Sequence, residues 1–150
     1  MSPRPSTRPS SPDEPDSGPR SLPWLASGEV LLADDDAPIR KVLSRALTRF
    51  GMTVAEVADG DDALELVRAA PGRFRLVVLD LTMPRLNGDE ALLRIREVAP
   101  DLPALILSGF LEDEIRERIG SAPRVSLLHK PFSMRSLADV LWEVLGQHEA

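Results

Sequence analysis

The chain has 150 residues, of which 43% are hydrophobic and 28% charged, as is ordinary for a globular protein with a sizeable core. Its net charge of -6 and pI near 4.9 exclude sequence-independent binding to nucleic acid, which needs a basic surface. Because it contains no cysteine, disulfides, thiolate metal sites and a thiol nucleophile are also excluded. No apolar run approaches the roughly 20 residues of a membrane span, and the chain does not begin with an apolar signal segment. We therefore expect a cytoplasmic protein without a membrane partner.

Residues 1–27 differ in composition from the rest of the chain. Seven of the 14 prolines and seven serines fall in this stretch. Little of it can be buried to offset the entropy cost of ordering, so we interpret it as a disordered Pro/Ser-rich tail before a domain of residues 28–147. The tail ends in the apolar cluster of residues 22–25, LPWL. This cluster has two interpretations: docking of Trp24 on the domain, or an exposed anchor for a partner.

From Gly28 onward, short apolar stretches alternate with amphipathic segments. The stretches that predict strands are residues 29–33, 52–57, 75–79, 104–107 and 125–128. The segments that predict helices run from Pro38 to Phe50, from Asp61 or Asp62 to Ala70, from Gly88 to Ala99, over about 111–119, and from a cap at Ser133 onward. Five strand–helix units predict an α/β fold: a doubly wound, five-stranded parallel sheet with helices on both faces and right-handed crossovers.

The third predicted strand leads directly into a carboxylate. Its run Leu-Val-Val-Leu, residues 76–79, is typical of a strand buried on both faces of a parallel sheet. We expect the strand to end at Asp80, where the chain turns through Pro84 and Gly88. A carboxylate at the carboxyl end of a parallel strand lies where open α/β sheets hold their ligands.

Polar residues follow four of the five predicted strands. They are Asp34, Asp35 and Asp36 after the first, Asp80 after the third, Ser108 after the fourth, and His129 and Lys130 after the fifth. The carboxyl ends of parallel strands share one edge of the sheet, so these side chains should converge. We interpret Asp36 as an N-cap of the first helix and His129 as a space-filling neighbour.

Several carboxylates brought together repel each other at neutral pH, so positive charge must compensate them. Lys130 supplies one charge, and Mg²⁺ suits a set of carboxylate, carbonyl and water oxygens. Such a pocket can receive a phosphoryl group, whose developing charge the metal and the lysine neutralise. Asp80, central in the set, is the natural nucleophile, since aspartate carboxylates are known to form acyl phosphates.

The chain resembles a response-regulator receiver domain of the CheY-like, flavodoxin-fold type. The matching motifs, in the family's order, are Val30 to Asp36 (VLLADDD), Ala58 to Leu64 (ADGDDAL), the Asp80 stretch, Leu107 to Gly109 (LSG) and His129 to Phe132 (HKPF). The spacing also agrees: 45 positions separate Asp35 from Asp80, and 22 separate Ser108 from Lys130. The resemblance covers about residues 28–147.

The resemblance implies a role for each matching residue. Asp80 corresponds to the phosphoacceptor, Asp35 to the direct Mg²⁺ ligand and Asp34 to the acid that acts through water. The backbone carbonyl of Thr82 corresponds to the third protein ligand. Two further residues correspond to groups that bind the phosphoryl group: the hydroxyl of Ser108 and the amine of Lys130. The Lys130-Pro131 bond resembles one that is cis in the family, and the phosphoryl donor there is a phosphohistidine on a kinase.

The resemblance also predicts how the protein acts. Because the receiver takes up about 120 residues, we expect a single-domain response regulator that is no enzyme beyond its own phosphorylation and dephosphorylation. It would receive its phosphoryl group from a histidine kinase or a histidine phosphotransfer protein, and signal by binding an unknown downstream protein or by relay. The motifs around Ser108 and Lys130 also resemble the receivers of hybrid histidine kinases, which fits a relay by analogy.

One departure from the family pattern keeps an alternative open. The family usually has an aromatic residue three positions before the lysine, and Leu127 stands there. Leucine cannot form the hydrogen bond of the usual switch, so a pseudo-receiver that binds partners without phosphorylation is one alternative. A haloacid-dehalogenase-type phosphatase is another, because its Asp-x-Asp signature can be matched to residues 34–36, although the cap domain and the later acidic motif are lacking.

Overall fold

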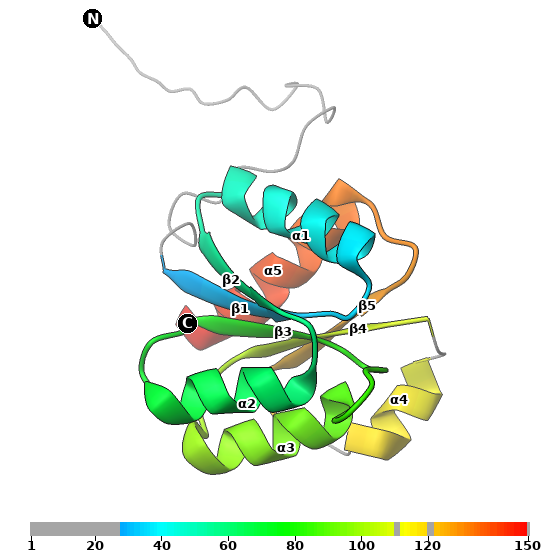
Figure 1. The fold of residues 1–150 in the computed structure, drawn as a ribbon. Helices are drawn as coiled ribbons and strands as arrows, with labels where there is room; N and C mark the ends of the chain where they lie inside the picture. Colours follow the sequence, from blue (N-terminus) through cyan, green and yellow to red (C-terminus); the bar gives the residue numbers. More distant parts are fainter. Residues whose placement is uncertain (1–27, 110–111, 120–121, 150) are drawn as a thin grey trace, which may run out of the picture.

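A computed structural model describes residues 28–109, 112–119 and 122–149. The predicted tail, with Trp24, and the start of the fourth predicted helix at Leu111 lie outside these ranges. Strands and helices alternate through the described part of the chain (Figure 1). The strands are β1 (Glu29–Ala33), β2 (Thr53–Val57), β3 (Leu76–Asp80), β4 (Ala104–Ser108) and β5 (Val125–His129). The helices are α1 (Ala37–Arg49), α2 (Gly60–Ala69), α3 (Gly88–Val98), α4 (Glu112–Ile119) and α5 (Met134–Glu149).

The strands form one parallel sheet in the order β2-β1-β3-β4-β5, which confirms the predicted α/β fold. The order reverses after β1: the chain first adds β2 on one side and then β3, β4 and β5 on the other. The crevice beyond the carboxyl ends of β1 and β3 is the usual ligand site of such a sheet. The central strand β3 is buried along its whole length, as its unbroken apolar run predicts.

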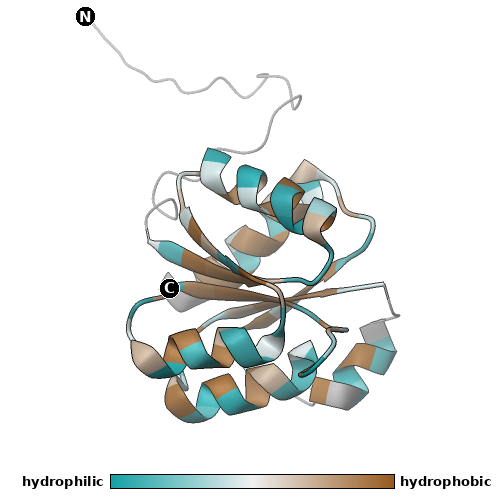
Figure 2. Cartoon of the chain, viewed as in Figure 1, coloured by the Kyte–Doolittle hydropathy of each residue, from teal (hydrophilic) through white to brown (hydrophobic). Residues whose placement is uncertain are grey.

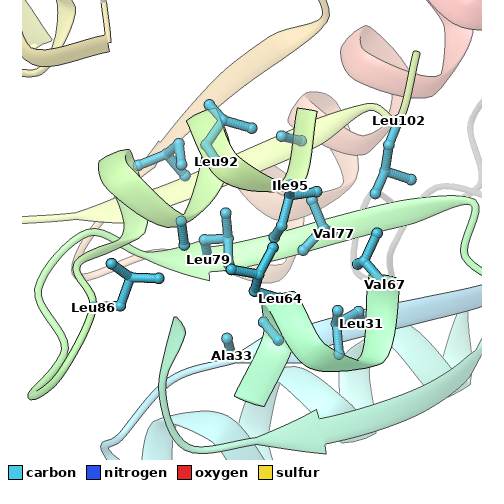
Figure 3. Close-up of a cluster of buried hydrophobic side chains, with 14 of the residues drawn as sticks. Leu31, Ala33, Leu64, Val67, Val77, Leu79, Leu86, Leu92, Ile95 and Leu102 are labelled. Carbon is cyan, nitrogen blue, oxygen red and sulfur yellow. The ribbon is translucent and has the colours of Figure 1, made fainter. Parts of the chain in front are cut away.

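Helices cover both faces of the sheet (Figures 1 and 2). On one face, α1 and α5 pack on the core that contains Leu32, Leu47 and Leu141. On the other face, α2, α3 and α4 pack on a second core, part of which Figure 3 shows around Leu79 and Ile95. None of the helices in the described ranges is long and apolar enough to cross a membrane.

The helix ends follow local capping chemistry. Asp36 is the N-cap of α1, and its carboxylate accepts a hydrogen bond from the Ile39 amide at 3.2 Å, which confirms the interpretation of this residue. The prediction that Asp61 or Asp62 begins the next helix is wrong. The helix α2 begins at Gly60, because Asp59 is its N-cap and accepts from the Asp62 amide at 3.0 Å.

Candidate functional site

The strands β1, β3, β4 and β5 end at one edge of the sheet (Figure 1), and the predicted polar residues lie at these ends or directly after them. Parallel pairing continues to the strand ends: Asp80 is in register with Leu107, and Ser108 with His129. Asp34 directly follows β1, and Lys130 directly follows β5. The sheet thereby brings together side chains that are almost 100 positions apart in the sequence.

Three carboxylates form a cluster at this edge. Asp34, Asp35 and Asp80 each offer an oxygen, and these oxygens all lie within 4.8 Å of one another. Asp34 is completely buried and Asp80 is 7% exposed, whereas Asp35 is exposed. One oxygen of Asp34, Oδ1, accepts a hydrogen bond from the Asp36 amide at 2.9 Å. The other, Oδ2, is buried without a hydrogen-bond partner, which is costly for a charged group.

Lys130 is the cation that faces the cluster. Its Nζ lies 3.3 Å from Asp80 Oδ1 and 3.6 Å from Asp34 Oδ2, and its side chain is 22% exposed. At 3.6 Å the contact with Asp34 is electrostatic and leaves Oδ2 without a hydrogen bond. One ammonium group thus opposes three carboxylates, so the site has an excess of negative charge.

The excess of negative charge contributes to a raised pKa of Asp80. Burial, followed by the negative charge of Asp34, raises the pKa of Asp80 to about 6, while Lys130 acts in the opposite direction. A carboxyl group with a raised pKa is held in a site that favours its neutral form. An added cation would restore the charged, nucleophilic form at a lower pH.

The raised pKa predicts a pH dependence for the stability of the metal-free protein. Unfolded Asp80 has a pKa of about 3.9, so its contribution to stability is present below about pH 4 and is lost as pH rises through about 6. Asp80→Asn mimics the neutral form and should stabilise the protein above pH 6, by on the order of 2 kcal/mol. Urea unfolding in chelator at pH 7.5 and at pH 4.5 checks this. An equal effect of the substitution at both pH values would contradict it.

Two more predicted site residues lie close by. Ser108 is buried at the end of β4, next to the strand that carries Asp80. Its carbonyl accepts a hydrogen bond from the Lys130 amide at 2.8 Å, which ties the ends of β4 and β5 together. Thr82 lies two residues beyond Asp80, in the loop between β3 and α3, with an exposed side chain. The Lys130-Pro131 bond is cis, as the resemblance implies.

The loop between β3 and α3 is braced by residues that the sequence reasoning did not assign. The Arg85 guanidinium donates to Oδ2 of Asp59 at 2.6 and 3.1 Å, which joins this loop to the start of α2. Although burial acts in the opposite direction, the Asp62 amide and Arg85 hold the pKa of Asp59 below its usual range. Asn87 accepts from the Met83 amide at 3.2 Å within the loop. Only the Asp-Gly pair before a helix could have signalled Asp59, as an N-cap.

The sequence analysis also did not identify Arg40, which contacts the loop after β1 that carries Asp34. Its side chain extends from α1 and donates to the Asp34 carbonyl at 2.7 Å and to the Glu56 carboxylate on β2 at 3.1 Å. These contacts fix the backbone of the loop after β1 and leave the Asp34 carboxylate in the cluster. No local spacing in the sequence links Arg40 to either partner.

The donor set fits a hard divalent cation. All the side-chain donors are carboxylate oxygens, and one of them, Asp34 Oδ2, is buried and lacks a hydrogen-bond partner. Mg²⁺ binds through one or two carboxylates and keeps several waters, which the exposed side of Asp35 permits. The cluster therefore combines a buried acid, Asp34, with an exposed acid, Asp35, so that one side of a bound ion would stay open to water or to another ligand.

Fold and site together define a protein of the CheY-like receiver class. A family model for the response regulator receiver domain matches residues 30–141. The chain belongs to this family. Chemotaxis protein CheY4 from Vibrio cholerae, whose structure has been solved, is 30% identical, with a TM-score of 0.72, over 80% of this chain and 100% of that one.

Curated relatives place the chain among two-component proteins. Sensor kinase CckA of Brucella abortus is 34% identical over 82% of this chain and 13% of its own length. The response regulator receiver protein CpdR of the same organism is 31% identical over 77% of this chain and 95% of its own length. Other response regulators match over less than half of their length. The solved receiver domain of sensor histidine kinase PA1611 from Pseudomonas aeruginosa, 28% identical with a TM-score of 0.70 over 81% of this chain and 99% of that one, holds a magnesium ion in its active-site cleft.

Proposed function

We propose that Asp80 accepts a phosphoryl group and that Mg²⁺ is held by Asp34, Asp35, Asp80 and the backbone carbonyl of Thr82. The observation that carries this proposal is the pairing of Asp80 with Lys130 beside the two further carboxylates of the cluster, Asp34 and Asp35. A bound magnesium ion would supply positive charge to the carboxylates and to the oxygens of the incoming phosphoryl group.

Three residues of the site would each have a separate role in the phosphoryl transfer. An oxygen of Asp80 attacks the phosphorus; a P–O bond forms while the P–N bond of a phosphohistidine breaks, and the imidazole leaves with the bonding electron pair. The Lys130 ammonium lies near enough to Asp80 to pair with an oxygen of the transferred group. Ser108, at the end of the neighbouring strand β4, would donate its hydroxyl hydrogen to another oxygen of the transferred group. Catalysis of this kind consists mainly of positioning and charge stabilisation.

The proposal extends to organisation and partners. The donor would be a histidine kinase or a histidine phosphotransfer protein, and the output would be binding of a target protein or relay of the phosphoryl group, in the cytoplasm and without nucleic acid. The receiver would take up residues 28–147, and residues 1–27 would be its tail. The only reaction catalysed would be the protein's own phosphorylation and dephosphorylation.

Leu127 is the observation that supports the pseudo-receiver alternative. It is half-buried on β5 and packs against the core under α2, α3 and α4, so it lacks both the hydroxyl and the ring of the family's switch residue. The complete acid set with Lys130 favours phosphorylation. The family match favours a receiver over a haloacid-dehalogenase-type phosphatase.

Intact mass after incubation with Mg²⁺ and acetyl phosphate tests the proposal. We expect one phosphoryl increment in the parent protein, none in Asp80→Asn and none in chelator. A parent protein that binds Mg²⁺ but gains no mass would then be tested with a phosphorylated histidine kinase, and failure there would overturn the proposal. Turnover of a small phosphate ester would support the phosphatase instead.

Magnesium should stabilise the protein through Asp35. At 100 times its dissociation constant, a ligand that binds only the folded state adds about 2.7 kcal/mol to the free energy of unfolding. Asp35→Asn should lose most of this gain, while the metal-free variant should be at least as stable as the parent, because one of three mutually repelling carboxylates is gone. Thermal unfolding with and without Mg²⁺ measures both effects.

Asp36→Asn is the matched control. It removes a carboxylate from the next position in the chain, and asparagine is as good an N-cap as aspartate. The control should keep the full magnesium effect. If both variants lose it equally, the metal is not held by the specific cluster of Asp34, Asp35 and Asp80.

A further inference from the structure

An open groove lies at the edge of the sheet opposite the acidic cluster. Its volume is about 390 Å³, and it is formed by the loop from α2 to β3 and the loop from α3 to β4. The lining is largely apolar and rich in proline; it includes Pro71, Phe74, Ala99, Pro100 and Pro103. A groove of this size lies in the lower range of sites that hold a small ligand or a large side chain.

The chain enters the described domain beside this groove. Arg75, which lines the groove, donates its amide to the Glu29 carbonyl at 2.8 Å. A Cβ built on Gly28 would lie 3.1 to 3.2 Å from the aliphatic part of the Arg75 side chain, and the φ of Gly28 is +105°. In Figure 1 the start of β1 and the turn into β3 lie at the same edge of the sheet. Any segment directly before Gly28 therefore starts next to the groove.

That segment contains the most apolar cluster of the first 27 residues. Residues 22–25 read Leu-Pro-Trp-Leu, and Trp24 is only four positions before Gly28. Four extended residues span about 13 Å. Since Gly28 already lies against Arg75, which lines the groove, residues this close to Gly28 are within reach of the lining. Tryptophan and proline are rigid side chains that gain from burial against other flat apolar surfaces. The short tether also gives the cluster an effective concentration on the order of millimolar, so that weak contacts suffice.

We propose that residues 22–25 dock intramolecularly in this groove, with Trp24 as the main contact. The docked segment covers the amino-terminal edge of β3 and β4, away from the carboxylates. The docking is independent of phosphorylation, so an experiment that contradicts the docking leaves the function proposed above unaffected, and the reverse also holds. It assigns a position to the single apolar element of an otherwise polar tail.

Trp24 fluorescence in the full-length chain tests the proposal. The chain has two tryptophans, so Trp142→Phe leaves Trp24 as the only one. We expect blue-shifted emission and at least about twofold weaker quenching by acrylamide than in the same protein carrying Gly72→Glu, because docking that is mostly populated excludes water and quencher. Gly72 lines the groove, and a Cβ there meets nothing within 4 Å, so the added charge perturbs the groove without a clash.

Leu93→Glu is the control, because it places the same charge at an exposed position of α3 that does not line the groove. It should leave the Trp24 signal unchanged. Solvent-like emission with the same quenching in all three proteins would overturn the proposal. Emission that shifts to the solvent-like value on dilution would also overturn it, in favour of docking on a second copy of the chain.

The absence of cysteine permits a second, direct measurement. A nitroxide quenches tryptophan fluorescence only when the two groups are in contact. A nitroxide attached to Gly72→Cys should therefore quench Trp24 strongly, whereas the same label on Leu93→Cys should not. Equal quenching by the two labels would show that Trp24 does not stay at the groove. This test does not depend on the effect of a charge at position 72.

Discussion

Replacing Lys130 by methionine should slow phosphoryl transfer to Asp80 by about 100-fold, because loss of one preorganised group that stabilises transition-state charge typically costs this much. The ammonium group lies 3.3 Å from Asp80 Oδ1, the side chain that would carry the phosphoryl group. Methionine keeps most of the aliphatic chain and removes the charge. The rate of mass gain with acetyl phosphate and Mg²⁺ measures the effect.

The same substitution should have opposite effects on stability and on metal binding. Without metal at neutral pH, Asp34 and Asp80 lose their compensating charge, which should cost about 2 kcal/mol, less than a fully buried pair because Lys130 is 22% exposed. Magnesium should bind more tightly, because the ammonium group no longer repels it. Calorimetric titration of Mg²⁺ at fixed pH distinguishes this from a general loss of structure.

Lys41→Met is the matched control, since Lys41 is the only other lysine of the chain. It lies on α1 with a side chain that is 62% exposed and 3.6 Å from Glu56. A surface pair of this kind contributes little, so phosphorylation, stability and metal affinity should stay close to those of the parent. Weaker Mg²⁺ binding in Lys130→Met would contradict the charge argument.

The sequence was enough to predict the fold because its local signals agree with one another. Apolar runs alternate with amphipathic segments, and the run before Asp80 has no polar break, as a central strand of a parallel sheet requires. The strand β3 ends at Asp80, as expected, whereas β4 and β5 each end one residue later than predicted, at Ser108 and His129. Parallel pairing continues through these polar residues, which periodicity of hydrophobicity cannot reveal.

The topology of the sheet was also enough to predict that the site residues meet at one edge. It was not enough to predict the burial and the pairing of their charged groups. The shared edge of the strands predicted that Asp34, Asp80 and Lys130 would meet. No pattern in the sequence indicates that Asp34 is completely buried with one oxygen unpaired, or that Arg85 reaches Asp59 across 26 positions. Such pairings depend on loop geometry and on side-chain rotamers, for which no local spacing exists.

Gly88→Ala should destabilise the protein by about 2 to 4 kcal/mol, although helix propensity alone favours alanine by about 1 kcal/mol. Gly88 is the first residue of α3, and its amide donates to the Leu81 carbonyl at 2.8 Å. A Cβ there would collide with the backbone carbonyl oxygen of Asp80 and crowd Leu81. Backbone cannot rotate away as a flexible side chain can, so the loop that follows Asp80 must move.

Gly72→Ala separates this steric effect from the general consequence of replacing glycine. A Cβ at Gly72 meets nothing within 4 Å, so the substitution should be neutral or stabilise by up to about 1 kcal/mol through the unfolded state. Urea unfolding of the two variants measures the difference, and magnesium titration adds a second readout. Because the carbonyl of Asp80 is displaced in Gly88→Ala, its Mg²⁺ affinity should fall as well. Equal stability of the two variants would mean that α3 moves away from β3 at little cost, and that the close approach of Gly88 does not hold Asp80 in place.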